Sequence, residues 1–107
     1  MAKYSIKQKD IINSTYVIKI YFFKDAHRKE TEEKTMYSKY EGQNERRDAF
    51  VYWREQIHYY REKSKFGFSV GDIYNNKDKT RNKKPILRIY GNGTEKWFSQ
   101  EMAALHV

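Results

Sequence analysis

The most regular pattern of apolar and polar positions along the chain is a seven-residue repeat between Arg47 and Lys65. Within each block of seven, a basic residue is followed by an acidic or amide residue and then by apolar and aromatic residues. Because each residue turns an α-helix by ~100°, a seven-residue step returns to nearly the same face. The repeat therefore predicts an amphipathic helix over 45–65 with two neighbouring stripes. The apolar stripe consists of Phe50, Trp53, Ile57 and Tyr60. The basic stripe consists of Arg47, Arg54, His58, Arg61 and Lys65.

Alternating positions predict strands on both sides of this helix. Residues 15–24 alternate with apolar or aromatic side chains on both faces, which is typical of a central strand. Residues 33–40 alternate more weakly and are expected to return antiparallel as the second strand of a hairpin. Further strands are expected over 66–74 and 86–90, and a short, frayed edge strand over 3–10.

The segment after the Gly91-Asn92-Gly93 turn allows two interpretations. Trp97, Met102 and Leu105 have the spacing of a short amphipathic helix, which we favour. A strand over 94–99 is the alternative. The pattern as a whole predicts a small α+β domain spanning 1–107, with a mostly antiparallel sheet packed on one central amphipathic helix. The expected order of elements is β-β-α-β-β-α, and the last element is the uncertain one.

Composition narrows the class of protein. The chain has 107 residues, of which 38% are hydrophobic and 17% aromatic, so we expect a core of few but large side chains. Cysteine is absent, which excludes disulfides and thiolate chemistry and suits a reducing cytosol. Residues 1–13 lack the apolar stretch of a signal peptide, so we expect a cytoplasmic protein. The Lys, Asn, Ile and Tyr usage is typical of an AT-rich genome, such as that of a low-GC bacterium or its phage.

The net charge of +8 at pH 7 predicts attraction to polyanions. Along the predicted helix, the arginines at positions 47, 54 and 61 have no acidic residue three or four positions away, so local ion pairs do not neutralise them. Arginine forks at ~10 Å intervals suit phosphate groups. Two other interpretations stay open. The stripe could pair with glutamates of the preceding hairpin, Glu30, Glu32 and Glu33, or it could be a solvated face.

A second basic segment is the polar loop over 75–84, which we expect to be flexible. Its cations are Lys77, Lys79, Arg81, Lys83 and Lys84. Such a loop can follow a phosphate backbone, although a solvated connector would look the same. Tyr52 and Tyr59 form another heptad pair on the helix flank. Exposed tyrosines beside cations can stack on unpaired bases or anchor a protein interface, whereas buried ones would cover the sheet.

No catalytic signature is present. The three histidines are scattered, and the sequence contains no phosphate-binding glycine loop or nucleophile motif, so no metal or cofactor is expected. The weakest of the functional interpretations is a metal-independent ribonuclease toxin. It would use His58, Arg54, Arg61 and a tyrosine for acid–base chemistry and phosphate stabilisation.

The leading expectation is a non-enzymatic domain that binds DNA or RNA through the basic stripe and the basic loop. The hairpin-then-helix order over 15–65 is similar to that of small DNA-binding modules that place a sheet on DNA, and it carries no residue roles. The alternative is a phage-type interaction protein that inhibits a host or defence nucleoprotein by protein–protein contact, as an anti-CRISPR protein does. Tyrosine, tryptophan and arginine are the residue types that dominate such interfaces.

Overall fold

The computed structural model describes residues 14–38, 45–77 and 84–106, and of residues 45–48 only the backbone. The strand expected over 3–10 lies outside these residues. The described elements are, in chain order, β1 (Tyr16–Phe23), β2 (Thr31–Tyr37), α2 (Glu45–Lys63), β3 (Phe68–Asn75), β4 (Leu87–Tyr90), β5 (Glu95–Trp97) and α3 (Gln100–His106). The predicted α+β class is confirmed, and one strand, β5, is added to the expected order.

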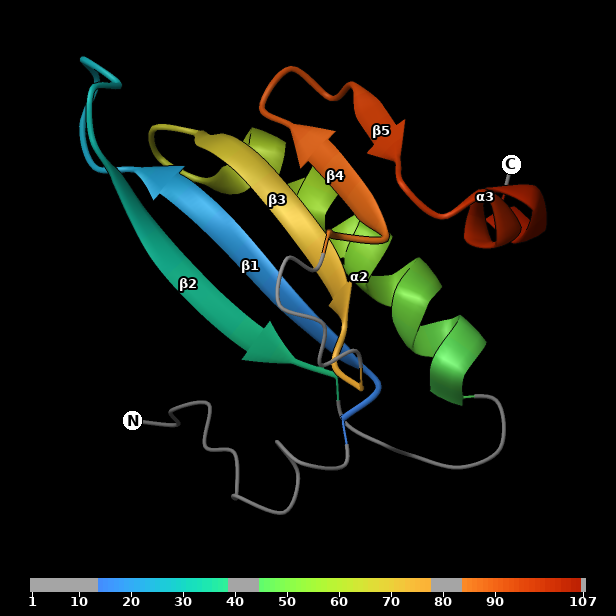
Figure 1. The fold of residues 1–107 in the computed structure, drawn as a ribbon. Helices are drawn as coiled ribbons and strands as arrows, with labels where there is room; N and C mark the ends of the chain where they lie inside the picture. The colour runs from blue at the N-terminus through green and yellow to red at the C-terminus, as the bar shows by residue number, and fades with distance from the viewer. Residues whose placement is uncertain (1–13, 39–44, 78–83, 107) are drawn as a thin grey trace.

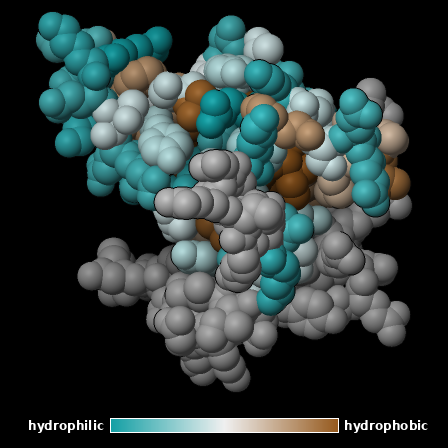
Figure 2. Space-filling model, in the orientation of Figure 1, coloured by the Kyte–Doolittle hydropathy of each residue, from teal (hydrophilic) through white to brown (hydrophobic). Residues whose placement is uncertain are grey.

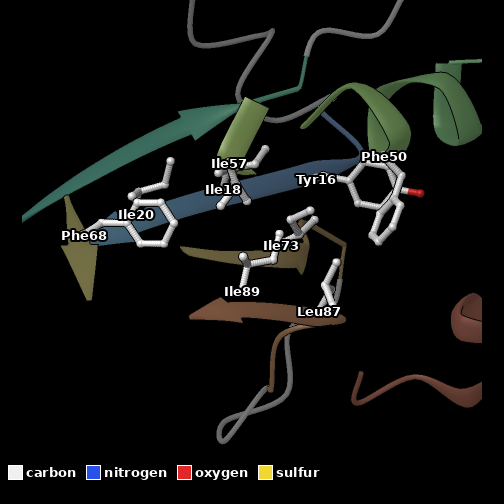
Figure 3. Packing of buried hydrophobic residues seen from close by; sticks show 9 residues of the cluster. All are labelled: Tyr16, Ile18, Ile20, Phe50, Ile57, Phe68, Ile73, Leu87 and Ile89. Atoms are coloured by element: carbon white, nitrogen blue, oxygen red, sulfur yellow. The ribbon is translucent and has the colours of Figure 1, made fainter. Parts of the chain in front are cut away.

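The strands form one antiparallel sheet in the order β2-β1-β3-β4-β5, with α2 behind it (Figure 1). β1 is an interior strand, paired with β2 on one side and β3 on the other, as its apolar residues on both faces predicted. Helix α2 contacts β1 and β3, so the core lies between the helix and the middle of the sheet. Figure 3 shows this core, which contains Tyr16, Ile18, Ile20, Phe50, Ile57, Phe68, Ile73, Leu87 and Ile89.

The predicted apolar stripe of the helix faces the sheet. Phe50 and Ile57 are completely buried, and Trp53 and Tyr60 pack partly buried against the same core. The helix ends at Lys63, two residues before the expected end, so Lys65 lies in the connection to β3 and on no helical face. Gly67 in this connection has a φ of 78°, a left-handed conformation that glycine adopts without steric cost.

Strand β2 alternates weakly because it lies at the edge of the sheet, outside the area covered by α2. Residues 31–35 are all exposed, and only Met36 and Tyr37 are partly buried. An edge strand with charged residues on both faces resists pairing with another chain. The tip of the β1–β2 hairpin is also hydrophilic, as the upper left of Figure 2 shows, and residues 24–30 are exposed.

The C-terminal segment contains both of the expected elements: a strand, β5, followed by a helix, α3. β4 turns at Gly91-Asn92-Gly93, where the amide of Tyr90 donates to the Thr94 carbonyl at 2.8 Å, and β5 pairs back onto β4. The helix starts only after Ser99, whose Oγ accepts a hydrogen bond from the Met102 amide at 3.2 Å, as an N-cap does. Trp97 therefore belongs to a strand and not, as we expected, to the helix.

No helix among residues 14–38, 45–77 and 84–106 is long and apolar enough to cross a membrane.

Gly71 determines how closely the helix approaches the sheet. A Cβ atom at this position would lie 2.7 Å from Ile57 Cγ2. We predict that Gly71→Ala lowers the free energy of unfolding by about 1–3 kcal/mol, because the helix must move away from β3. Urea denaturation measures this change. Ser69→Ala, at an exposed position of the same strand, should change stability by less than about 0.5 kcal/mol.

The double variant Gly71→Ala/Ile57→Ala distinguishes the clash with Ile57 from any other effect of alanine at position 71. Removing the Ile57 side chain opens the space, so the two changes should be strongly non-additive. Additive losses, or an unchanged midpoint for Gly71→Ala alone, would contradict the close approach.

Candidate functional site

Three polar side chains, Arg54, His58 and Glu95, form a cluster between α2 and β5, which we call the Glu95 cluster. Arg54 binds Glu95 through both carboxylate oxygens, with Nε at 2.8 Å from Oε2 and Nη2 at 2.6 Å from Oε1. His58 Nε2 lies 2.8 Å from the same Oε2. Glu95 comes from the helix-facing side of β5, since its register partner in β4 is Ile89, a core residue. The central part of the basic stripe therefore has an internal counter-charge.

This pairing corrects the choice of acids made from the sequence, which pointed to Glu30, Glu32 and Glu33. None of these forms an ion pair with a described side chain of α2. Glu33 instead accepts hydrogen bonds from the hydroxyls of Tyr21 and Thr35. Tyr21 and Glu33 are register partners, and the pairs on either side of them face the helix. Because successive residues of a strand point to opposite faces, Tyr21 and Glu33 lie on the sheet face away from α2. Burial and the Glu33 carboxylate raise the pKa of Tyr21 to about 12.

The contacts between Glu95 and Arg54 shift the pKa values of both groups. The hydrogen bonds from Arg54, and then those from His58, hold the pKa of the Glu95 carboxyl below its usual range, against the opposing effect of burial. The carboxylate raises the pKa of Arg54 in return. Glu95 therefore stays ionised at neutral pH and neutralises Arg54.

The cluster also attaches the C-terminal helix. Arg54 Nη1 donates to the carbonyl of His106 at 3.1 Å, and its guanidinium lies 5.2 Å from the centre of the Trp97 ring. The His106 ring stacks on Trp97 and lies 4.7 Å from Phe50, between centroids. No side chain of α3 is fully buried, and the helix is attached by these contacts of His106 and by Met102, which packs partly buried against the core.

An open pocket of about 600 Å³ lies over the Glu95 cluster, bounded by α2 and the β4–β5 turn. The guanidinium of Arg61 lies against Gly93 of this turn. The structure thus places Arg54, His58 and Arg61, the residues expected for a ribonuclease, in one region. However, Arg54 and His58 are both already bound to Glu95. Among the described residues, no group of three His, Asp or Glu side chains is arranged to hold a metal ion.

Of the other predicted site residues of α2, those with described side chains, Tyr52, Tyr59 and Arg61, are exposed. Tyr52 and Tyr59 are 53% and 51% exposed, so they do not cover the sheet. Arg61, Lys63 and Lys65 form what we call the cationic end of α2, and all three are exposed. Lys63 lies 6.0 Å from the Tyr59 ring centre, and Lys65 lies 5.3 Å from that of Phe66.

The basic loop is described only at its two ends. Lys77 and Lys84 are exposed, and the amide of Lys77 donates to Asn75 Oδ1 at 2.9 Å. The other predicted loop cations, Lys79, Arg81 and Lys83, lie outside the described residues, as does the side chain of Arg47. Their roles stay predictions.

A second ion pair, which sequence reasoning missed, lies on the sheet face away from the helix. Arg88 of β4 binds both carboxylate oxygens of Asp72 at 2.8 and 2.9 Å, and Asp72 is completely buried. The two residues are register partners, and Tyr74 donates to the same carboxylate at 3.3 Å. The bidentate bond to Asp72 raises the pKa of Arg88. An aspartate within an apolar strand is the only signal in the sequence for this pair.

No protein-family model, curated protein or solved structure matches this chain.

Glu95→Gln tests the structural role of the cluster. The amide keeps the shape of the side chain but leaves Arg54 without a counter-charge, so we predict a loss of about 1–3 kcal/mol in unfolding free energy at pH 7. Because folding lowers the pKa of Glu95, its contribution is present above the unfolded value of about 4.3 and is lost as pH falls through the folded pKa. The difference between the two proteins should therefore shrink on acidification, as measured by urea denaturation across pH.

The matched control is Glu62→Gln, which makes the same chemical change at an exposed position of α2. It should alter stability by less than about 0.5 kcal/mol. Equal effects of the two substitutions would show that the Glu95 cluster adds no stability.

Proposed function

We propose that this protein binds nucleic acid through the cationic end of α2. The observation that carries the proposal is that Arg61, Lys63 and Lys65 are exposed and close in sequence, and that none of them pairs with a carboxylate among the described residues. Two of the three, Lys63 and Lys65, lie within cation–π distance of an aromatic ring. Grouped cations of this kind attract phosphate groups and release counterions on binding.

The proposal shifts the expected interface along the helix. Arg54 and His58 are engaged by Glu95, and separating them from it to contact phosphate would leave a partly buried carboxylate without its partners. The cationic end has no such cost. The net charge of +8 adds a long-range attraction that steers any polyanion toward the protein. The loop that follows β3 remains a proposed second contact, through Lys77 and Lys84 among others.

A second candidate function is inhibition of a host or defence nucleoprotein by direct protein contact. The observation that favours it is that large apolar and aromatic side chains are exposed on α2 and α3: Val51 is 38%, Tyr52 53% and Leu105 63% exposed. Tyrosines of this kind are common anchors of protein interfaces. In this case the cationic end would contact an acidic groove or the nucleic acid held by the target.

Removing two charges from the cationic end gives a quantitative test. We predict that the double variant Arg61→Gln/Lys65→Gln binds duplex or single-stranded oligonucleotides more weakly. The slope of log affinity against log salt should become shallower by about 0.9 per lost phosphate contact on duplex DNA. Fluorescence anisotropy over a salt series measures both. The control is Lys29→Gln/Lys96→Gln, which removes the same charge from the hairpin tip and from β5 and should leave the slope nearly unchanged.

Wild-type protein that shows no salt-sensitive binding to duplex DNA, single strands or RNA would contradict the proposal. Affinity capture with and without nuclease distinguishes the second candidate: stoichiometric capture of one host protein that survives nuclease treatment would favour protein-directed inhibition. Incubation of the protein with RNA tests for enzymatic activity. Full-length RNA after incubation agrees with a non-enzymatic domain, and cleavage that is lost in His58→Ala would indicate a ribonuclease.

A further inference from the structure

A groove with a volume of about 530 Å³ lies between the C-terminal part of α2 and the β1–β2 hairpin, and we call it the α2–β2 groove. Its lining combines aromatic and basic side chains. They include Phe22, Lys34, Tyr59, Lys63, Lys65 and Phe66. This groove is separate from the pocket over the Glu95 cluster, because the two share no lining residue.

The groove exists because the helix does not cover the edge strand. Helix α2 packs over β1 and β3, whereas β2 extends beyond it. Lys34 of β2 is the register partner of the core residue Ile20, so its side chain projects from the same sheet face on which the helix lies. The space between this strand and the last turns of α2 therefore stays open.

The walls of the groove are aromatic. Phe22 of β1 meets Tyr60 edge to face, with 5.7 Å between ring centroids, and the Tyr59 and Tyr60 rings are 6.2 Å apart. Tyr60 is fixed against the core, but Tyr59 remains 51% exposed. A planar ligand can therefore reach the Tyr59 ring without displacing any core side chain.

Cations line the rim of the groove. Lys34, Lys63 and Lys65 contribute three positive charges, and Glu32 is the single acidic residue in the lining. Two of the lysines lie next to an aromatic ring, Lys63 at 6.0 Å from the Tyr59 centroid and Lys65 at 5.3 Å from that of Phe66. A chain of planar groups linked by anions matches this arrangement of rings and cations.

We infer that the α2–β2 groove binds single-stranded nucleic acid, with an unpaired base stacked on Tyr59 and the adjoining phosphates on Lys34, Lys63 and Lys65. This inference rests on the proposed function and adds the strandedness and the position of the base. A duplex keeps its bases stacked inside the helix, so they cannot reach a tyrosine at the wall of a groove. An acidic peptide would satisfy the lysines but would leave the exposed ring without a planar partner.

The test compares binding of the full chain to three fluorescent probes at one salt concentration: oligouridylate, an abasic oligonucleotide with the same number of phosphates, and a duplex of the same length. We expect the base-bearing single strand to bind most tightly. Tyr59→Ala should weaken its binding by roughly 5- to 100-fold and leave the abasic strand nearly unaffected, because only the stacking contribution is lost. Tyr59→Phe should retain most of the affinity.

Tyr52→Ala is the matched control, because Tyr52 lies on the same helix, is equally exposed, and does not line the groove. It should bind all three probes as the wild-type protein does. Equal affinity for the abasic and base-bearing strands, or an unchanged affinity in Tyr59→Ala, would overturn the groove inference while salt-sensitive binding still upheld the proposed function. Competition by polyglutamate as effective as that by oligouridylate would also overturn it. Absence of binding to every probe would overturn both.

Discussion

The carboxylate of Glu95 is the constraint on which the described C-terminal part of the molecule depends. It sits on a three-residue strand that has little pairing of its own, and it binds Arg54 and His58 of the central helix. Through Arg54 it also fixes the aromatic stack that attaches α3. The same pairing neutralises Arg54 within the chain, whereas Arg61 and Lys63 have no carboxylate partner among the described residues.

The position of the helix on the sheet has a second consequence. Because α2 covers the middle strands and not β2, the sheet keeps an uncovered edge next to the last turns of the helix. That edge carries charged residues, so it resists pairing with another chain and instead borders a groove with aromatic walls. The opposite face is fixed by its own buried ion pair, between Asp72 and Arg88. Packing thus leaves Arg61, Lys63 and Lys65 exposed at the C-terminal end of α2, without a carboxylate partner among the described residues.

Local patterns predicted the main elements, because alternation and helical periodicity are properties of neighbouring residues. The long helix, the interior strand β1 and the apolar stripe were all readable in this way. The partner of Arg54 was not, because Glu95 lies 41 positions away and belongs to a strand too short to show alternation. The exposure of Tyr59 could not be predicted either, since it depends on where the helix crosses the sheet. Helical periodicity defines a stripe, but tertiary packing decides which stripe is covered.

The central claim is that a nucleic acid contacts the cationic end of α2 and not the Glu95 cluster. The most direct test is an NMR titration of the isotope-labelled protein with a short single-stranded oligonucleotide, following backbone amides and aromatic side chains. We expect the shift changes to concentrate at Tyr59, Lys63 and Lys65 and to spare the Glu95 cluster. Changes centred on Arg54 and His58, or spread evenly over the surface, would contradict it.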